Sequence, residues 1–202
     1  MNQIIKNTII LFVITLVAGI CLGTVHDITL DPIAQAQEAA ATKTYQEVYP
    51  DAASFDEPQE LADAVTAAAD SISEWGFGKV TINDAKEALD ASGNQIGYLI
   101  TSTSAESYGG NVQIAVGITN EGELTGIGFL SISDTPGLGM RAKEPDFKDQ
   151  FIGKKAENLE VTKTGASADN QIEAISGATI TSKAVTNATD AASYFVANCL
   201  AQ

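Results

Sequence analysis

The stretch that decides the fold is residues 112–132, VQIAVGITNEGELTGIGFLSI. Large apolar side chains recur at every second position of residues 112–118, which is the period of a half-buried β-strand. Residues 120–123 contain Gly122 and predict a turn, because glycine readily adopts positive φ. A second apolar run, residues 127–132, follows at once. The stretch therefore predicts two antiparallel strands joined by a tight turn.

The sequence on either side extends this pattern. Ile96, Tyr98 and Ile100 also alternate with other residues, so we expect a meander of at least three strands over about residues 95–132. Apolar residues recur at three- and four-residue steps in residues 59–74 and again from Val185 to about residue 199, which predicts one helix in each segment. The expected fold class is α+β, with an antiparallel sheet flanked by helices.

An uncharged apolar run, NTIILFVITLVAGICLGTVH, occupies residues 7–26. A helix rises about 1.5 Å per residue, so this run spans the ~30 Å hydrocarbon core of a bilayer. Lys6 precedes the run and Asp27 follows it, which favours a cytoplasmic N-terminus and an exported remainder. A cleaved signal peptide is the alternative, but the nearest small-residue cleavage pattern, at residues 34–36, lies far beyond the run.

These features predict four segments. We expect a cytoplasmic N-terminus at residues 1–6, a single transmembrane helix at 7–26, a stalk of short helical pieces with an amphipathic helix at 27–75, and an extracytoplasmic domain at 76–202.

The composition excludes several classes of function. The chain has 202 residues and a formal net charge of −15, which argues against nucleic acid as a partner because phosphate neutralisation requires Lys and Arg. Two cysteines and one histidine are too few for a multi-cysteine iron–sulfur or zinc site, so no metal site is expected. Any chemistry must rely on hydroxyls, carboxylates, the backbone or a bound cofactor.

The first candidate ligand-binding segment is residues 134–139, DTPGLG, directly after the predicted sheet. Two glycines and a proline within four residues indicate a rigid, exposed turn at which backbone amides can approach a ligand closely. A tight loop that merely leaves the sheet is the alternative, and the residues alone leave both open.

The second candidate segment is residues 175–182, ISGATITS, which leads into the predicted C-terminal helix. We expect Thr181 or Ser182 to be the N-cap of that helix. A hydroxyl-rich loop at a helix N-terminus is a favourable site for a phosphate, because N–H groups and the helix dipole favour negative charge there, and Lys183 is close enough to assist. An ordinary cap with a small-residue turn remains the alternative.

The two segments together carry a family resemblance. Residues 135–139, TPGLG, and residues 176–179, SGAT, stand in order and about forty residues apart behind one N-terminal anchor. This combination resembles the FMN-binding domain shared by RnfG of the Rnf electron-transport complex and NqrC of the sodium-pumping NADH:quinone oxidoreductase. Residues 108–110 and 147–154 are also similar to that family. The chain departs from the family pattern at two positions, Asp134 and Glu173, where the family usually has Glu and Asp.

The resemblance implies the cofactor and its site. It implies FMN linked covalently by a phosphoester to Thr179, through an extracytoplasmic flavin transferase, with no catalytic residue beyond the flavin. The loop at Gly177 and Ala178 would be slim enough for the phosphate, and Ser176 and Thr181 would hydrogen-bond the phosphodiester. The residues implied beside the isoalloxazine ring are Thr135, Pro136, Gly137, Leu138 and Gly139.

The resemblance also implies a function and partners. The chain is expected to be an electron-carrying member of a membrane-bound, ion-translocating ferredoxin:NAD oxidoreductase, acting with other membrane proteins of the Rnf complex and not catalytic alone. NqrC of the sodium-pumping quinone reductase is one alternative, although its exported domain is usually longer. The other is an anchored module that holds FMN or another phosphate ligand noncovalently, without a redox role.

Overall fold

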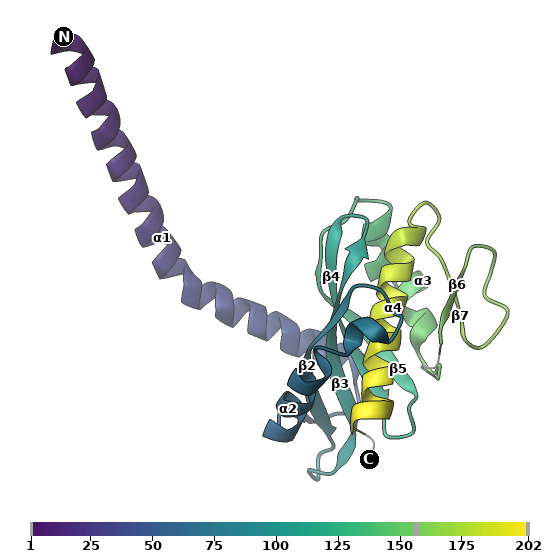
Figure 1. Ribbon diagram of the computed structural model, residues 1–202. Coiled ribbons are helices and arrows are strands. Elements are labelled where there is room, and N and C mark those ends of the chain that lie inside the picture. The colour runs from purple at the N-terminus through teal and green to yellow at the C-terminus, as the bar shows by residue number, and fades with distance from the viewer. Residues whose placement is uncertain (1, 156–157, 201–202) are drawn as a thin grey trace. The chain divides into compact units, whose positions relative to one another are not determined.

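The computed structural model describes residues 2–155 and 158–200 (Figure 1). Residue 1 of the expected segment 1–6 lies outside the described residues. So do residues 156–157 and 201–202 of the expected domain at 76–202. The chain divides into two compact units, Met1–Thr42 and Lys43–Gln202.

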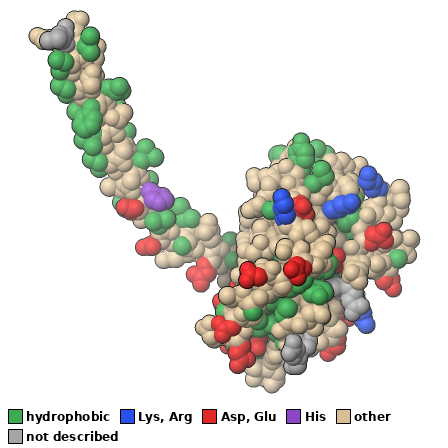
Figure 2. Space-filling view, viewed as in Figure 1, with side chains coloured by type: hydrophobic (Ala, Val, Ile, Leu, Met, Phe, Trp, Pro, Cys, Tyr) green, Lys and Arg blue, Asp and Glu red, His purple; other side chains and the backbone are tan. Residues whose placement is uncertain are grey.

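One long helix, α1 (Asn2–Val48), contains all of the described part of the first unit. Its apolar part reaches a mean hydropathy of 2.6, and among the described residues it is the one helix long and apolar enough to cross a membrane. Figure 2 shows hydrophobic side chains along its N-terminal part and acidic side chains farther along. The expectation of short helical pieces is wrong up to Val48: the helix continues past Pro32, because the Ala-, Gln- and Glu-rich sequence that follows is strongly helix-forming.

The second unit contains a five-stranded antiparallel meander, which confirms the strands expected over residues 95–132. Its strands lie side by side in chain order: β1 (Ser54–Asp56), β2 (Val80–Leu89), β3 (Gln95–Ser107), β4 (Gly110–Thr119) and β5 (Leu124–Ile132). Sequence analysis missed β2. A register shift between Ile82 and Asp84 interrupts its alternation, so the pattern of two is lost at that bulge.

The remaining elements are short, apart from the last helix. They are α2 (Gln59–Ala68), three 3₁₀ turns (Ile72–Glu74, Gly139–Lys143 and Asp149–Phe151), α3 (Pro145–Lys148), the parallel pair β6 (Glu160–Thr162) and β7 (Gln171–Glu173), and α4 (Thr179–Phe195), which ends in a π turn at Val196–Leu200.

The core lies between one face of the sheet and α4, which crosses it (Figure 1). Ile100 and Ile114 of the sheet are fully buried there, as are Val185 and Ala188 of the helix. The Ser102 hydroxyl of β3 donates a hydrogen bond of 3.0 Å to the Ala188 carbonyl. The small residues on α4 allow this close approach, so the sheet fixes the helix and thereby its N-terminus.

The opposite face of the sheet carries the end of α1. The Thr125 hydroxyl donates to the Val48 carbonyl at 2.7 Å, and the Tyr49 hydroxyl donates to the Ile96 carbonyl at 2.8 Å. A Cβ on Gly128 would lie 2.4 Å from Thr44 Cγ2 and 2.6 Å from Val48 Cγ2. The sheet therefore accepts these side chains because a glycine stands at position 128.

Gly128→Ala tests this packing. We expect the free energy of unfolding to fall by about 1–3 kcal/mol, because the new methyl overpacks the contact with Val48. Denaturant unfolding of the full chain in detergent measures the effect. Ala91→Val, in the exposed β2–β3 turn, is the control and should leave the free energy of unfolding nearly unchanged. An unchanged unfolding midpoint for Gly128→Ala would contradict the packing account.

A buried acid makes the stability depend on pH. Asp190 of α4 is 5% exposed, and its Oδ1 accepts a hydrogen bond of 3.1 Å from the Leu159 N–H. Burial raises the pKa of Asp190 to about 7, because desolvation disfavours the carboxylate and outweighs the Leu159 hydrogen bond. The folded state thus holds this proton more tightly than the unfolded chain does.

The sign of the effect follows from linkage. The contribution of Asp190 is fully present below the ordinary pKa of an aspartate and is lost as the pH rises toward about 7. Asp190→Asn keeps an oxygen acceptor for Leu159 and cannot ionise, so we expect it to gain stability relative to the native chain between about pH 5 and pH 8. Asp169→Asn, at an exposed aspartate, is the matched control. If the unfolding free energies of Asp190→Asn and the native chain differed by the same amount at about pH 5 and about pH 8, this account would be contradicted.

Candidate functional site

The TPGLG segment forms a tight turn after β5. The Leu138 N–H donates to the Thr135 carbonyl at 3.1 Å, and Gly137 has a φ of +77°. Positive φ at the third turn position, after a proline at the second, is what a type II turn requires. The turn expected from the sequence is thus confirmed, with Pro136 and Gly137 exposed at its crest.

The SGAT segment forms a second turn of the same kind. The Ala178 N–H donates to the Ile175 carbonyl at 2.9 Å, and Gly177 has a φ of +80°. Helix α4 begins directly afterwards at Thr179, and its first intrahelical bond runs from the Ser182 N–H to the Ala178 carbonyl at 3.0 Å. Thr179 is therefore the first residue of the helix.

The predicted N-cap is wrong. Ala178 holds the N-cap position and makes no side-chain capping bond. The Ser182 hydroxyl instead accepts the Ile175 N–H and donates to the Ala178 carbonyl, each at 3.0 Å. The helix starts earlier than expected because the turn at Gly177 already reverses the chain, and Ser182 then braces that turn from within the helix.

The two turns touch each other. A Cβ on Gly177 would lie 2.9 Å from Leu138 Cδ2. Thr179, half-buried beside this contact, borders two cavities of about 470 and 510 Å³. Both are in the size range of small-molecule sites. The fold thus brings together two segments that are about forty residues apart in sequence.

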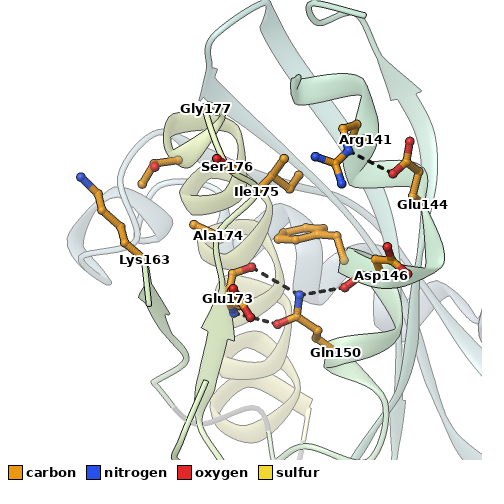
Figure 3. Close-up of a pocket in the computed structure, with 12 residues that line it drawn as sticks. Arg141, Glu144, Asp146, Gln150, Lys163, Glu173, Ala174, Ile175, Ser176 and Gly177 are labelled. Carbon is orange, nitrogen blue, oxygen red and sulfur yellow. Dashed lines mark hydrogen bonds and ion pairs between the residues drawn. The ribbon is translucent and has the colours of Figure 1, made fainter. Parts of the chain in front are cut away.

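The first cavity, of about 470 Å³, has charged walls (Figure 3). The Arg141 Nε donates to Glu144 at 3.1 Å, and Lys163 lies across the cavity on the side of β6. The Gln150 side chain joins α3 to β7, since its amide nitrogen donates to the Asp146 carbonyl at 3.0 Å and its amide oxygen accepts the Glu173 N–H at 2.7 Å. Ser176, Gly177 and Thr179 are the sequence-predicted residues that border this cavity.

The second cavity, of about 510 Å³, has an exposed apolar rim. Tyr108, Leu138 and Ile180 expose 72%, 41% and 54% of their surface there, which is unusual for large hydrophobic residues. Most of the sequence-predicted residues border it: Thr135, Leu138, Gly139, Gly177, Ala178, Thr179 and Thr181. Pro136, Gly137 and Lys183 border neither cavity.

Several residues that border the cavities were not among the predicted site residues, and Tyr108, Arg141, Lys163 and Ile180 are examples. Tyr108 stood in a segment that resembled the family, but its type gave no role. Ile180 follows Thr179 in the first turn of α4, and its side chain is exposed in the structure. The sequence alone carries no signal of this exposure.

The Asp134 carboxylate connects the walls of the second cavity. Its Oδ2 accepts hydrogen bonds from the Ser107 hydroxyl at 2.9 Å and the Thr181 hydroxyl at 2.7 Å, and its Oδ1 accepts the Thr135 N–H at 2.6 Å. Burial opposes ionisation, but these bonds, with one from the Gly109 N–H, outweigh it and hold the pKa of Asp134 below its usual value.

The geometry suits a phosphate ester on Thr179. The first N–H groups of α4, from Thr179 to Thr181, have no carbonyl of the helix to bond, and the helix dipole favours an anion there. The Thr181 hydroxyl, however, is fully buried and donates its proton to Asp134. The Thr181 hydroxyl is therefore engaged with Asp134, whereas sequence analysis expected it to hydrogen-bond the phosphodiester.

Comparisons with known proteins agree with the resemblance. Residues 1–48 match the model of the RnfG N-terminal region, and residues 107–193 match that of the FMN-binding domain. The chain is 36% identical over 192 residues to the G subunit of the Na⁺-translocating ferredoxin:NAD⁺ oxidoreductase complex of Acetobacterium woodii, covering 91% of this chain and 87% of that protein.

A second G subunit and a solved structure also match the chain. The G subunit of the proton-translocating ferredoxin:NAD⁺ oxidoreductase complex of Clostridium ljungdahlii is 30% identical over 187 residues, covering 92% of this chain and 87% of that protein. The crystal structure of Shewanella oneidensis NqrC aligns with a TM-score of 0.48 at 18% identity, covering 58% of this chain and 61% of that one. From the extent of its match to the two G subunits, the chain belongs to the RnfG family of ion-translocating oxidoreductase complexes.

Proposed function

We propose that this chain carries electrons within a membrane-bound ferredoxin:NAD oxidoreductase of the Rnf type, using FMN attached to Thr179 through a phosphoester. The observation that carries this proposal is the position of Thr179, which begins α4 where the two turns meet and borders both cavities. The names of the relatives, both G subunits of ion-translocating ferredoxin:NAD⁺ oxidoreductase complexes, support the assignment to such a complex.

The residues around Thr179 divide the work of holding the cofactor. The Thr179 hydroxyl is the attachment point, and the N–H groups of the first turn of α4 stabilise the single negative charge of the phosphodiester. Gly177 leaves room beside Leu138, because a side chain there would collide with the leucine. The apolar rim of the second cavity suits the isoalloxazine ring, with Leu138 and the TPGLG backbone on one side.

The bound FMN supplies the electron transfer, while the protein fixes its position and environment. The chain itself has two cysteines and one histidine, too few for an iron–sulfur cluster. We therefore infer that electrons arrive from and leave to other proteins of the complex. An ester link would keep the flavin beside those partners at high local concentration.

We further propose that α1 crosses the membrane at residues 7–26, with residues 1–6 in the cytoplasm. Residues 27–75 would then connect the membrane to a flavin domain at 76–202 on the extracytoplasmic side, where the flavin transferase would act. Support comes from the length and apolar composition of α1 and from Lys6 at its cytoplasmic end.

The mass of the intact chain tests the covalent cofactor. Chain purified from its native membrane and denatured should be heavier by FMN less one water, and Thr179→Ala should lack this gain because the acceptor oxygen is gone. Thr164→Ala, at an exposed threonine outside both cavities, is the matched control and should keep the flavin. Mass spectrometry of the denatured chains gives the result.

The outcomes separate the proposals. A native chain without added mass, in cells whose flavin transferase is active, would contradict the proposal that the chain carries FMN covalently. Flavin that co-purifies with the folded chain but is released on denaturation would instead favour the noncovalent module. Added mass on Thr179→Ala would move the attachment point elsewhere.

The orientation is tested by labelling single cysteines with a membrane-impermeant maleimide. In a background of Cys21→Ala and Cys199→Ser, Ser92→Cys in the exposed β2–β3 turn should react in intact spheroplasts. Asn2→Cys should react only after the membrane is opened, because it would lie in the cytoplasm. The reverse pattern would contradict the proposed topology.

A further inference from the structure

We propose that Asp134 is a positioning residue for flavin attachment: its carboxylate holds the first turn of α4 against the TPGLG turn and thereby presents the Thr179 hydroxyl to the flavin transferase. This inference rests on the proposed function, because it names the group that prepares the same threonine.

The carboxylate joins three segments that are separate in sequence. Ser107 ends β3, Thr135 begins the TPGLG turn, and Thr181 is the third residue of α4. Each donates a hydrogen bond to Asp134, at 2.9, 2.6 and 2.7 Å respectively. Bonds to an ionised acceptor are stronger than bonds between neutral groups, so this one side chain restrains all three segments.

Two glycines make room for Asp134. A Cβ on Gly139 would lie 2.2 Å from Asp134 Cγ, and a Cβ on Gly109 would lie 2.7 Å from Asp134 Cα. Real side chains cannot approach so closely. A larger residue at position 139 would displace the carboxylate, and one at position 109 would collide first with the Ser133 carbonyl oxygen, at 1.9 Å, and then with the Asp134 backbone. The last glycine of the TPGLG turn is thus explained by the carboxylate beside it, with no ligand needed.

The restraint reaches Thr179 through the first turn of the helix. The N-cap, Ala178, has no polar side chain, so α4 lacks a cap of its own. Asp134 places a negative charge at this helix end from another segment, where the helix dipole favours it. The Thr181 hydroxyl donates a hydrogen bond to Asp134, and the Ser182 hydroxyl accepts one from the Ile175 N–H. Hydrogen bonds therefore fix Thr181 and Ser182, which follow Thr179 and Ile180 in the helix.

Asp134 has no hydrogen bond to Thr179 among the described interactions, so its effect is on the position of the hydroxyl. Within the described part of the chain, its side-chain hydrogen bonds are made to Ser107, Thr135 and Thr181. The expected consequence is a slower transfer step with an unchanged affinity of the transferase for the chain.

The test is the rate of flavin attachment to purified, full-length chain without flavin, in detergent, on addition of the flavin transferase and a flavin dinucleotide donor. In this step the Thr179 oxygen forms a bond to the FMN phosphorus, the pyrophosphate bond of the donor breaks, the nucleoside monophosphate leaves and the hydroxyl proton is released. Intact mass gives the modified fraction over time at several chain concentrations. We expect Asp134→Asn to lower kcat about tenfold, the loss expected for a charged hydrogen bond, with KM for the chain unchanged. Asp134→Glu, which keeps the charge, should retain more of the rate than Asp134→Asn.

Two more variants isolate the contact with the helix. Thr181→Val preserves the shape of the buried side chain and removes its hydroxyl, so it should slow attachment as Asp134→Asn does. The double variant should be no slower than Asp134→Asn, because both changes break one interaction. Asp169→Asn removes an exposed carboxylate that borders neither cavity and should keep the native rate.

Thermal unfolding of each variant shows whether it folds, and if Asp134→Asn does not, Thr181→Val decides the matter. A folded Asp134→Asn chain with a rate within about twofold of the native one would overturn the inference, as would a loss confined to KM or fully additive effects of the two changes. Failure of the proposed function is distinct: the native chain would then accept no flavin, or Thr179→Ala would still accept it.

Discussion

The hydrogen bonds of Asp134 are the interaction on which the surroundings of Thr179 depend. They join the end of β3, the TPGLG turn and the first turn of α4, three segments that only the folded chain brings together. The rest of the domain supports this junction, because the sheet holds α4 along its length through a core of small side chains and Ile residues. The turn at Gly177 then leaves Thr179 as the first residue of that helix, beside two cavities.

Much of this architecture could be predicted from the sequence, because local periodicity encodes it. Alternation at residues 112–118 and a glycine-containing turn predicted the β4–β5 hairpin, and the three- and four-residue spacing after Val185 predicted the C-terminal helix. The β2 strand was missed because its bulge at Asp84 shifts the alternation. The stalk was predicted as short helical pieces, yet α1 continues through Pro32 to Val48.

The site was only partly predictable, for a different physical reason. Both turns could be predicted locally from Gly137 and Gly177, whose positive φ is a property of the turn itself. The role of the Thr181 hydroxyl could not, because it is set by Asp134, which lies 47 residues earlier in the chain. The same holds for the exposed apolar rim, since Tyr108 comes from the β3–β4 connection and Ile180 from the start of α4. Long-range contacts of this kind leave no periodic signal.

The central claim is that FMN is esterified to Thr179 and to no neighbouring hydroxyl. Cleavage after Lys163 and Lys183 yields the peptide of residues 164–183, which contains Thr179 together with Ser167, Ser176, Thr181 and other hydroxyl residues. Fragmentation of this peptide from native membranes by electron-transfer mass spectrometry locates the added group. We predict phosphoester-linked FMN on Thr179 alone. The same group on Ser176, Thr181 or Ser182, or an unmodified peptide from cells with active transferase, would contradict this claim.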